Sequence, residues 1–274
     1  MYVGIDVGGT KTLVTVLSAK GKIVEQAKFP TPPIYSNFVL ELAHTLAHFE
    51  HQDFKAAAIA IPGRIDRERG VALDLGNLDW HNIPVQADCE KILKCPVVVD
   101  NDANLAGLGE AVLHPEVKTV LYITISTGIG SGVISGGKIE PALANIEAGQ
   151  MELPFNGKLM KWEHFASGRA IYEHFNKKAM DIHDEASWRY IVRNLGLGMF
   201  NLIAIVEPDL IIIGGSVGSY FDRYEHLLKA ELNKHDVPVV HIPPVISAKR
   251  PEEAVIYGCY ELIKQTFPHH AAST

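Results

Sequence analysis

Short apolar runs interrupted by glycine turns open the chain. Tyr2–Asp6 alternates into an apolar run that stops at Gly8-Gly9, and Lys11–Ser18 is apolar again and rich in Val, Leu and Thr. Gly21-Lys22 marks a second turn, after which Ile23–Phe29 resumes the strand-like pattern. Three short strands joined by two glycine-containing turns predict an antiparallel meander.

Helical and strand-like patterns alternate over the rest of the first half. Apolar residues recur with a helical period over Asn37–His51. The next segments are predicted to be a strand at Ala57–Ile61, a helix at Val85–Lys94, a strand at Val97–Val99 and a helix at Ala103–Leu113.

The same order begins again near residue 119. A strand pattern at Thr119–Ile125 is followed by a glycine-rich turn at 126–132 and by a second hairpin around Ser135-Gly136-Gly137. Helices are then predicted at Glu163–Lys178, Glu185–Ile205, Tyr220–Asn233 and Glu252–Gln265, and strands at Leu210–Ile213 and Val239–Ile246. This repetition predicts an α/β fold of two duplicated α/β domains, residues 1–113 with a C-terminal helix at about 252–274, and residues 114–251. Small-molecule sites often form between domains, so we expect a cleft there.

Composition and charge exclude several classes of protein. The 274 residues are 47% hydrophobic and 21% charged, which is ordinary for a globular protein and excludes disorder. The net charge of -7 and the lack of a basic run predict no nucleic-acid partner. No stretch approaches the roughly 20 consecutive apolar residues of a membrane span, so no membrane partner is expected. Three scattered cysteines, and Asp6 in the first apolar stretch where a signal peptide would be uninterrupted, favour the cytoplasm.

The first candidate for chemistry is the turn Asp6-Val7-Gly8-Gly9-Thr10-Lys11. Two glycines let the backbone approach a ligand, and a phosphate can accept hydrogen bonds from their N–H groups and from Thr10. Asp6 at the strand end is placed to hold a metal-bound water, and Lys11 can offset phosphate charge. The alternative interpretation is an ordinary hairpin turn with a solvated lysine.

Two more glycine turns lie in the second half of the chain. Ser126–Gly132 occupies the place equivalent to the first turn, and its three alternating glycines exceed what a simple reversal needs. Gly214-Gly215-Ser216 follows a strand and opens a helix, where a flat ligand can approach closely and the helix N-terminus favours anions. A tight strand-to-helix turn is the alternative for this second motif.

The fourth candidate is the polar cluster Asp100-Asn101-Asp102-Ala103-Asn104 at a strand end and helix start. Asp102 can act as a general base on an alcohol, with Asn101 orienting it. Helix capping is the alternative, because Asn and Asp are preferred N-caps. One cap, however, needs only one such residue.

Taken together, these motifs resemble the ROK family (repressor, open reading frame, kinase) of bacterial sugar kinases, in the actin-like ATPase superfamily with its ribonuclease H-like fold. The resemblance covers nearly the whole chain and depends on the order of the motifs. They are Asp6–Lys11, Pro62-Gly63, Asn77-Leu78-Asp79-Trp80, Asn101–Asn104 with Gly109-Glu110, Ser126–Gly132, Glu147-Ala148-Gly149, Glu163 with Ala166-Ser167-Gly168, and Gly214-Gly215-Ser216.

The resemblance implies a role for each matching residue. Asp102 resembles the catalytic base that takes the proton of the sugar hydroxyl. The residues implied in ATP binding are Asp6, Gly8, Gly9, Thr10, Lys11, Thr127, Gly128, Gly214 and Gly215. Those implied in sugar binding are Asn77, Asn101, Asp102, Glu147, Gln150 and Glu163. Mg²⁺ on the ATP phosphates, and a homodimer, are also implied.

One departure from the family pattern concerns zinc. Many members carry a structural zinc bound by one His and three Cys, but the matching positions here are Gln150, Pro154, Asn156 and Lys161. None of these side chains is a usual Zn²⁺ ligand, and the thirteen histidines show no ligand spacing, so no zinc is predicted. Gln150 can still hydrogen-bond a sugar hydroxyl through its amide.

The sequence therefore predicts an ATP-dependent hexose kinase that acts on the 6-hydroxyl of a sugar such as glucose. A kinase for an N-acetylhexosamine (N-acetylmannosamine or N-acetylglucosamine) or for fructose is the alternative, as is a non-catalytic sugar-binding member. A repressor is not expected, because the first glycine turn begins at residue 6 and leaves no room for a DNA-binding module before it.

Overall fold

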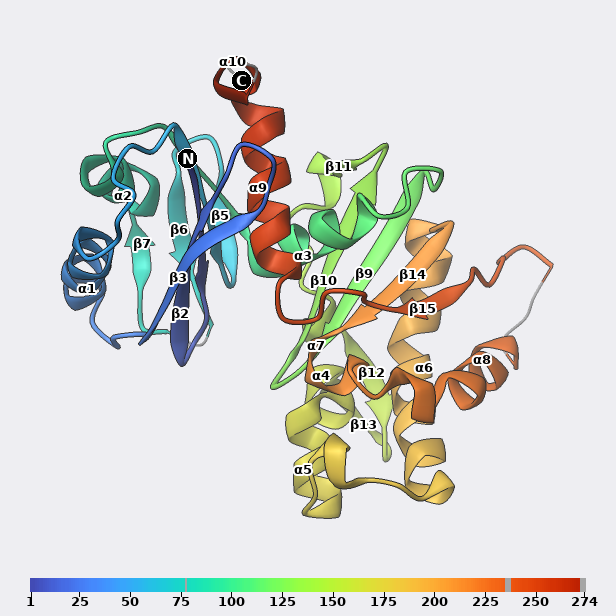
Figure 1. The fold of residues 1–274 in the computed structure, drawn as a ribbon. Coiled ribbons are helices and arrows are strands. Elements are labelled where there is room, and N and C mark those ends of the chain that lie inside the picture. Colours follow the sequence, from blue (N-terminus) through green and yellow to red (C-terminus); the bar gives the residue numbers. More distant parts are fainter. Residues whose placement is uncertain (77, 235–237, 272–274) are drawn as a thin grey trace. The chain divides into compact units, whose positions relative to one another are not determined.

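The computed structural model describes residues 1–76, 78–234 and 238–271. The chain forms two compact units, Met1–Gly109 with Glu253–Thr274, and Glu110–Glu252 (Figure 1). It passes from one to the other at Gly109–Glu110 and at Glu252–Glu253.

The first unit is built on a five-stranded sheet of order β3-β2-β1-β4-β8. Its strands are β1 (Tyr2–Val7), β2 (Lys11–Leu17), β3 (Ile23–Pro30), β4 (Ala56–Ile61) and β8 (Val97–Asn101). The first three strands pair antiparallel, which confirms the predicted meander, and β4 runs parallel to both β1 and β8. The parallel strands bring their carboxyl ends to one edge of the sheet.

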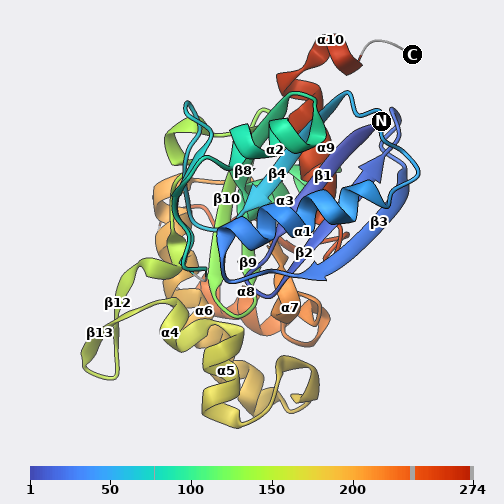
Figure 2. The same cartoon turned by 90° about the vertical axis from the view of Figure 1, so that its left-hand side faces the viewer.

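Helices cover both faces of this sheet. They are α1 (Tyr35–Ala47), α2 (Val85–Leu93), α3 (Asp102–Ala111) and α9 (Ala254–Thr266), and the short α10 (Pro268–Ala271) follows α9. Val3 and Ile5 point into the core with Phe38 of α1, whereas Gly4, between them, faces Cys259 of α9. Helices α1 and α9 lie on opposite faces of the sheet (Figure 2). This alternation is the period of two expected for a strand buried on both faces. A small sheet of β5 (Arg64–Asp66), β6 (Val71–Asp74) and β7 (His81–Ile83) was not predicted from the sequence.

The second unit repeats the strand order of the first. Its sheet runs β11-β10-β9-β14-β15, with β9 (Thr119–Ile125), β10 (Ile129–Ser135), β11 (Lys138–Ile139), β14 (Leu210–Gly214) and β15 (Val245–Ser247). Again the opening strands pair antiparallel and the later ones parallel. The two sheets have the same topology, which confirms the predicted duplicated α/β fold. The predicted strand at Val239–Ile246 is shorter, because only its end pairs with β14.

The remaining elements of the second unit pack on or beside this sheet. They are β12 (Glu152–Phe155), β13 (Lys158–Lys161), α4 (Glu163–Ala166), α5 (Gly168–Phe175), α6 (Glu185–Val206), α7 (Gly215–Gly218) and α8 (Glu225–Asn233), with 3-10 turns at Pro141–Leu143, Ala148–Gln150, Ala179–Asp181 and Phe221–Arg223. The helix predicted over Glu163–Lys178 is two helices, because extended Ser167 ends α4 and its side chain caps α5.

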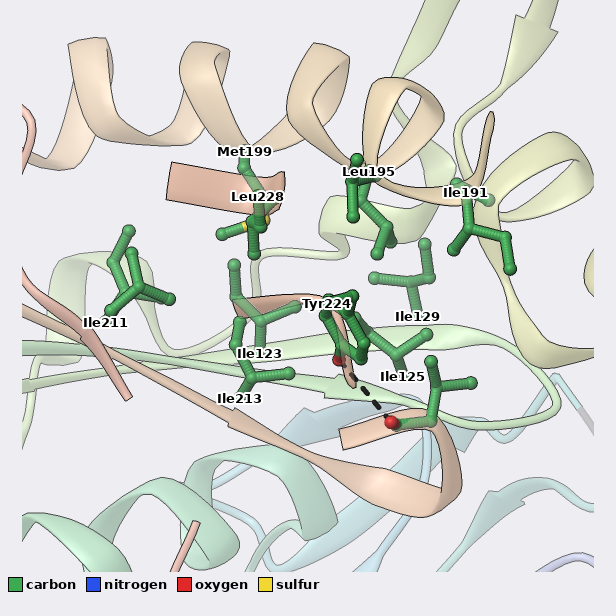
Figure 3. Close-up of a cluster of buried hydrophobic side chains, with 14 of the residues drawn as sticks. Ile123, Ile125, Ile129, Ile191, Leu195, Met199, Ile211, Ile213, Tyr224 and Leu228 are labelled. Carbon is green, nitrogen blue, oxygen red and sulfur yellow. Dashed lines mark hydrogen bonds between the residues drawn. The ribbon is translucent and has the colours of Figure 1, made fainter. Parts of the chain in front are cut away.

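The core of the second unit lies between its sheet and helices α6 and α8 (Figure 3). Leu195 and Met199 of α6 face Ile123 and Ile213 of the sheet, and all four side chains are buried. Burying one such side chain is worth roughly 1.5–3 kcal/mol. Among the described residues, α6 is the one helix whose length and composition would suit a membrane span, and half of its apolar window is buried in this unit.

Candidate functional site

Polar side chains gather at the carboxyl ends of the parallel strands in the first unit. Asp6 on β1 pairs in register with Ala60 on β4, which pairs in turn with Asp100 on β8. Asn101 ends β8, and Asp102 begins α3 directly after it. Ligands of open α/β sheets bind beyond the carboxyl ends of the strands, so these residues stand at the expected edge.

The carboxyl groups of Asp6 and Asp102 at this edge both have a raised pKa, and burial is the main cause. Burial raises the pKa of Asp6 to about 7; the negative charge of Asp102 adds to the effect and Lys28 opposes it. Burial also raises the pKa of Asp102, although the Ala103 amide donates to Asp102 Oδ1 at 2.8 Å and partly offsets the rise. A carboxylate with raised proton affinity is a stronger base than an exposed aspartate.

The neighbouring Asp100 and Asn101 are held by structural hydrogen bonds. Arg67 donates two bonds to Asp100, at 2.8 and 2.7 Å, and Asn104 donates a third at 2.9 Å. Asn101 Oδ1 accepts from the amides of Ala103 at 2.9 Å and of Asn104 at 3.3 Å, which is the geometry of a helix cap. The capping interpretation therefore describes Asn101, and the network orients the start of α3 that carries Asp102.

The first glycine turn is closed by backbone bonds that leave its tip exposed. Gly8 N–H donates to the Lys11 carbonyl at 3.0 Å, and the Thr31 hydroxyl donates to the Gly8 carbonyl at 2.7 Å. Gly9, Thr10 and Lys11 are all solvent exposed. Their N–H, hydroxyl and ammonium groups can therefore reach an anionic ligand.

The equivalent turn of the second unit packs against two helices. Ser126 N–H donates to the Gly128 carbonyl at 2.9 Å, and Gly168 N–H donates to the Ser126 carbonyl at 2.7 Å. A Cβ on Gly128 would lie 2.6 Å from Oε2 of Glu163, so a larger residue there would displace this carboxylate. Thr127 at the tip is exposed.

The glycine pair after β14 also needs to be glycine. A Cβ on Gly214 would overlap the Tyr122 hydroxyl. Gly215 has a φ of +78°, and its Cβ would lie 2.5 Å from the Ile125 carbonyl oxygen. The turn therefore lies directly on β9, beside the turn at Ser126.

These two turns border a cavity of about 390 Å³ within the second unit. It is lined by Ser126, Thr127, Gly168, Arg169, Tyr172, Lys178, Ala179, Met180, Ser216, Val217 and Tyr220. The size and the mixture of apolar walls with a few polar groups suit a small molecule. Tyr172 and Met180 are about half exposed, at 50% and 51%, so both present apolar surface at the cavity wall.

Sequence reasoning missed most of this lining. Arg169, Tyr172, Lys178, Met180 and Tyr220 come from α5, the following 3-10 turn and the segment after α7. None belongs to a motif with characteristic spacing, so folding alone identifies them. The glycine turns were the available signal, since the cavity lies between them.

Three other predicted residues lie close together in the second unit. Gln150 Nε2 donates to Glu163 Oε1 at 2.7 Å, and the Ile129 amide donates to Glu163 Oε2 at 3.4 Å. Glu147 is exposed and begins the 3-10 turn that ends at Gln150. Asn77, the remaining predicted sugar ligand, lies outside the described residues.

The positions that match zinc ligands in the family are occupied by residues that are not usual zinc ligands. Pro154, Asn156 and Lys161 lie in the hairpin of β12 and β13. Within residues 1–76, 78–234 and 238–271, no group of three or more His, Cys, Asp or Glu side chains is arranged to hold a metal ion. The three cysteines are buried and unpaired, and burial raises the pKa of Cys95 to about 11.

Comparison with known proteins identifies the family to which the chain is similar. Residues 2–266 match the profile of the ROK family. A glucokinase of Streptomyces coelicolor is 26% identical over 98% of this chain and 99% of its own length. A protein of Bacillus subtilis described as a putative fructokinase is 29% identical over 100% of this chain and 98% of its own.

A solved structure has the same fold. It is a ROK family glucokinase from Streptomyces griseus in complex with glucose and AMPPNP, with 25% identity and a TM-score of 0.82. The similarity covers 96% of this chain and 99% of that one.

Proposed function

The chain belongs to the ROK family, and on that premise we propose that it is an ATP-dependent sugar kinase that phosphorylates the 6-hydroxyl of a hexose such as glucose. The observation that carries the proposal is the partly buried carboxylate of Asp102, whose pKa is raised and whose position at the start of α3 is held by the Asp100 network. Relatives that share the fold bind glucose and an ATP analogue or are glucokinases.

In the proposed reaction, Asp102 accepts the proton of the sugar hydroxyl. The hydroxyl oxygen forms a bond to the γ-phosphorus of ATP, the bond from that phosphorus to the bridging oxygen breaks, and ADP leaves. The chain contributes positioning and charge, which are the main sources of catalysis in phosphoryl transfer.

For the nucleotide, we assign the exposed tips of the two equivalent turns to the phosphates. These are Gly8, Gly9, Thr10 and Lys11 in one unit and Thr127 with Gly128 in the other. The cavity of about 390 Å³ would take the adenosine, with Gly214 and Gly215 permitting its close approach.

Mg²⁺ is expected to arrive with the ATP phosphates. Asp6 suits a role beside it, because its carboxylate stands next to that of Asp102 and the pair has excess negative charge that a cation would offset. Asp6 would hold a water of the metal's shell, and the bound ion would neutralise charge that develops on the phosphates.

For the sugar, we assign carboxylates and amides that can satisfy hydroxyl groups. Asn77, Asn101, Glu147, Gln150 and Glu163 are the proposed ligands. Carboxylates accept from hydroxyls, whereas amides both donate and accept. Glu163 has the strongest support in this set, because hydrogen bonds from Gln150 and from the Ile129 amide already orient its two carboxylate oxygens.

We also propose that the enzyme is a cytoplasmic homodimer that works without zinc. Metal analysis of the purified protein should find less than stoichiometric zinc, and light scattering should give twice the chain mass of 30.1 kDa.

A coupled ADP-release assay across a sugar panel tests the proposal. The panel contains glucose, fructose, mannose, N-acetylglucosamine and N-acetylmannosamine, with MgATP. We expect sugar-dependent ADP release that is greatest with glucose; a larger rate with fructose or an N-acetylhexosamine would replace glucose by that sugar. No release with any member would refute the kinase proposal and indicate a non-catalytic sugar-binding protein.

A further inference from the structure

The carboxylate of Glu163 is held at both of its oxygens. Gln150 Nε2 donates to Oε1 at 2.7 Å, and the amide of Ile129 donates to Oε2 at 3.4 Å. A Cβ on Gly128 would lie 2.6 Å from Oε2, and one on Gly149 would lie 3.1 Å from it. Gly128 and Gly149 thus leave space for Oε2, while the side chain of Gln150 donates a hydrogen bond to Oε1.

A β-hairpin brings Gln150 to this carboxylate. Between them the chain runs out along β12 and back along β13, with Glu152 paired to Lys161, and Trp162 N–H donates to the Met151 carbonyl at 2.8 Å. The tip is a two-residue turn of Asn156 and Gly157, with φ values of +49° and +76°. Positive φ at both residues is typical of a type I′ turn, whose twist matches that of the strands.

The base of the hairpin is anchored in the core of the second unit. Trp162, which directly precedes Glu163, is fully buried and donates from Nε1 to the Asn194 carbonyl at 3.1 Å. Phe155 of β12 stacks on Phe165 of α4, with ring centroids 4.4 Å apart and planes at 7°. The segment on each side of the Gln150–Glu163 bond is therefore fixed.

We propose that Gln150 is a positioning residue that fixes the orientation of Glu163 for a sugar hydroxyl, and that the hairpin between them holds Gln150 in place for this role. The inference rests on the proposed sugar kinase function. An amide suits this role, because Glu163 needs a donor and the amide keeps a second N–H and an oxygen for the ligand. The donor also carries no charge that changes with pH.

The primary test compares Gln150→Ala with the wild-type enzyme. A hydrogen bond to a charged group is lost, so KM for the sugar should rise about ten-fold, whereas KM for ATP and kcat should change less than about three-fold. Gln150→His keeps an N–H donor and should restore most of the affinity. The same comparison in a Glu163→Ala background should show a clearly smaller rise, since Gln150 acts mainly through Glu163.

A matched pair of glycines tests the role of the hairpin. Gly157 and Gly137 both lie at hairpin tips, with φ of +76° and +75°, and a Cβ on either meets nothing within 4 Å. Alanine therefore imposes the same backbone strain at each position. Gly157→Ala should raise KM for the sugar two- to five-fold, whereas Gly137→Ala should leave it unchanged.

The outcomes separate this inference from the proposed function. Absence of sugar-dependent activity in the wild-type protein refutes the kinase proposal, while an active wild type with an unchanged Gln150→Ala variant refutes the positioning role. An equal rise in KM with and without Glu163 would show that Gln150 acts only by its own contact with the sugar and would overturn the positioning role. Crystal structures of the wild-type protein and of Gln150→Ala test the inference without an activity measurement. The Glu163 side chain should lose its single orientation in Gln150→Ala, and an unchanged rotamer would contradict the proposal.

Discussion

Replacing Asp6 by Asn should stabilise the protein in a way that depends on pH. Burial and the charge of Asp102 raise the pKa of Asp6 from 3.8 to about 7 in the folded state. Between these two values the folded protein binds a proton that the unfolded chain releases, so folding becomes less favourable as pH rises. Asn carries no such charge. Above pH 7, Asp6→Asn therefore removes the free-energy cost of burying the charged carboxylate, whereas below pH 4 Asp6 is protonated in both states and the substitution removes no such cost.

The pKa shift sets the size of the effect. A rise from 3.8 to about 7 is roughly three pKa units, which at 1.36 kcal/mol each sets a ceiling of about 4 kcal/mol. The Asp6 side chain is partly exposed, and solvent screening reduces the effect to about 2 kcal/mol. For a unit of this size, that corresponds to a Tm increase of roughly 6 °C.

Thermal unfolding at pH 4, 5, 6, 7 and 8, without nucleotide or Mg²⁺, measures the prediction. The Tm difference between Asp6→Asn and the wild-type protein should be near zero at pH 4 and reach its full value at pH 8. Asp53→Asn removes the same charge from the surface and controls for net charge. In an Asp102→Asn background the difference should shrink, because the repulsive neighbour is gone. A Tm difference that stays constant from pH 4 to 8 would refute the reasoning.

Three further predictions concern the site and its support. Asp102→Asn should lower kcat by roughly 10²–10⁴ with ATP affinity nearly intact, as measured by coupled assay and calorimetry; near wild-type turnover would remove it as the base. Gly215→Val, at φ +78° and against the Ile125 carbonyl, should raise KM for ATP more than about ten-fold in a protein with native circular dichroism. An unchanged KM there would argue against the assigned nucleotide cavity. Arg67→Ala leaves the carboxylate of Asp100, only 5% exposed, without its bidentate partner, and should cost about 3 kcal/mol in urea unfolding at pH 7. A loss below about 1 kcal/mol would mean that the pair contributes little.

Much of the fold follows from local sequence signals. The glycine turn at Gly8-Gly9 separates strands that pair antiparallel, as predicted. Of the turn predicted over Ser126–Gly132, only residues 126–128 form the turn, because Ile129–Gly132 already pair with β9 as the start of β10. Asp102 could be chosen because it follows a buried strand and opens a helix. These features can be predicted from the sequence because they depend on residues that are neighbours in the chain. They are the backbone freedom of glycine, the alternation of side chains along strands and the capping of helix starts.

Only the tertiary structure shows which hydrogen bonds, ion pairs and pKa shifts each polar side chain has. Asp100 and Asp102 look alike in the sequence, yet one is paired with Arg67 and the other keeps a raised pKa. Gln150 and Glu163 are joined across a hairpin. The cavity of the second unit likewise forms from segments that share no sequence motif. Hydrogen bonding, burial and charge at these places depend on atoms that are distant in the chain and become neighbours only when the strands and helices pack.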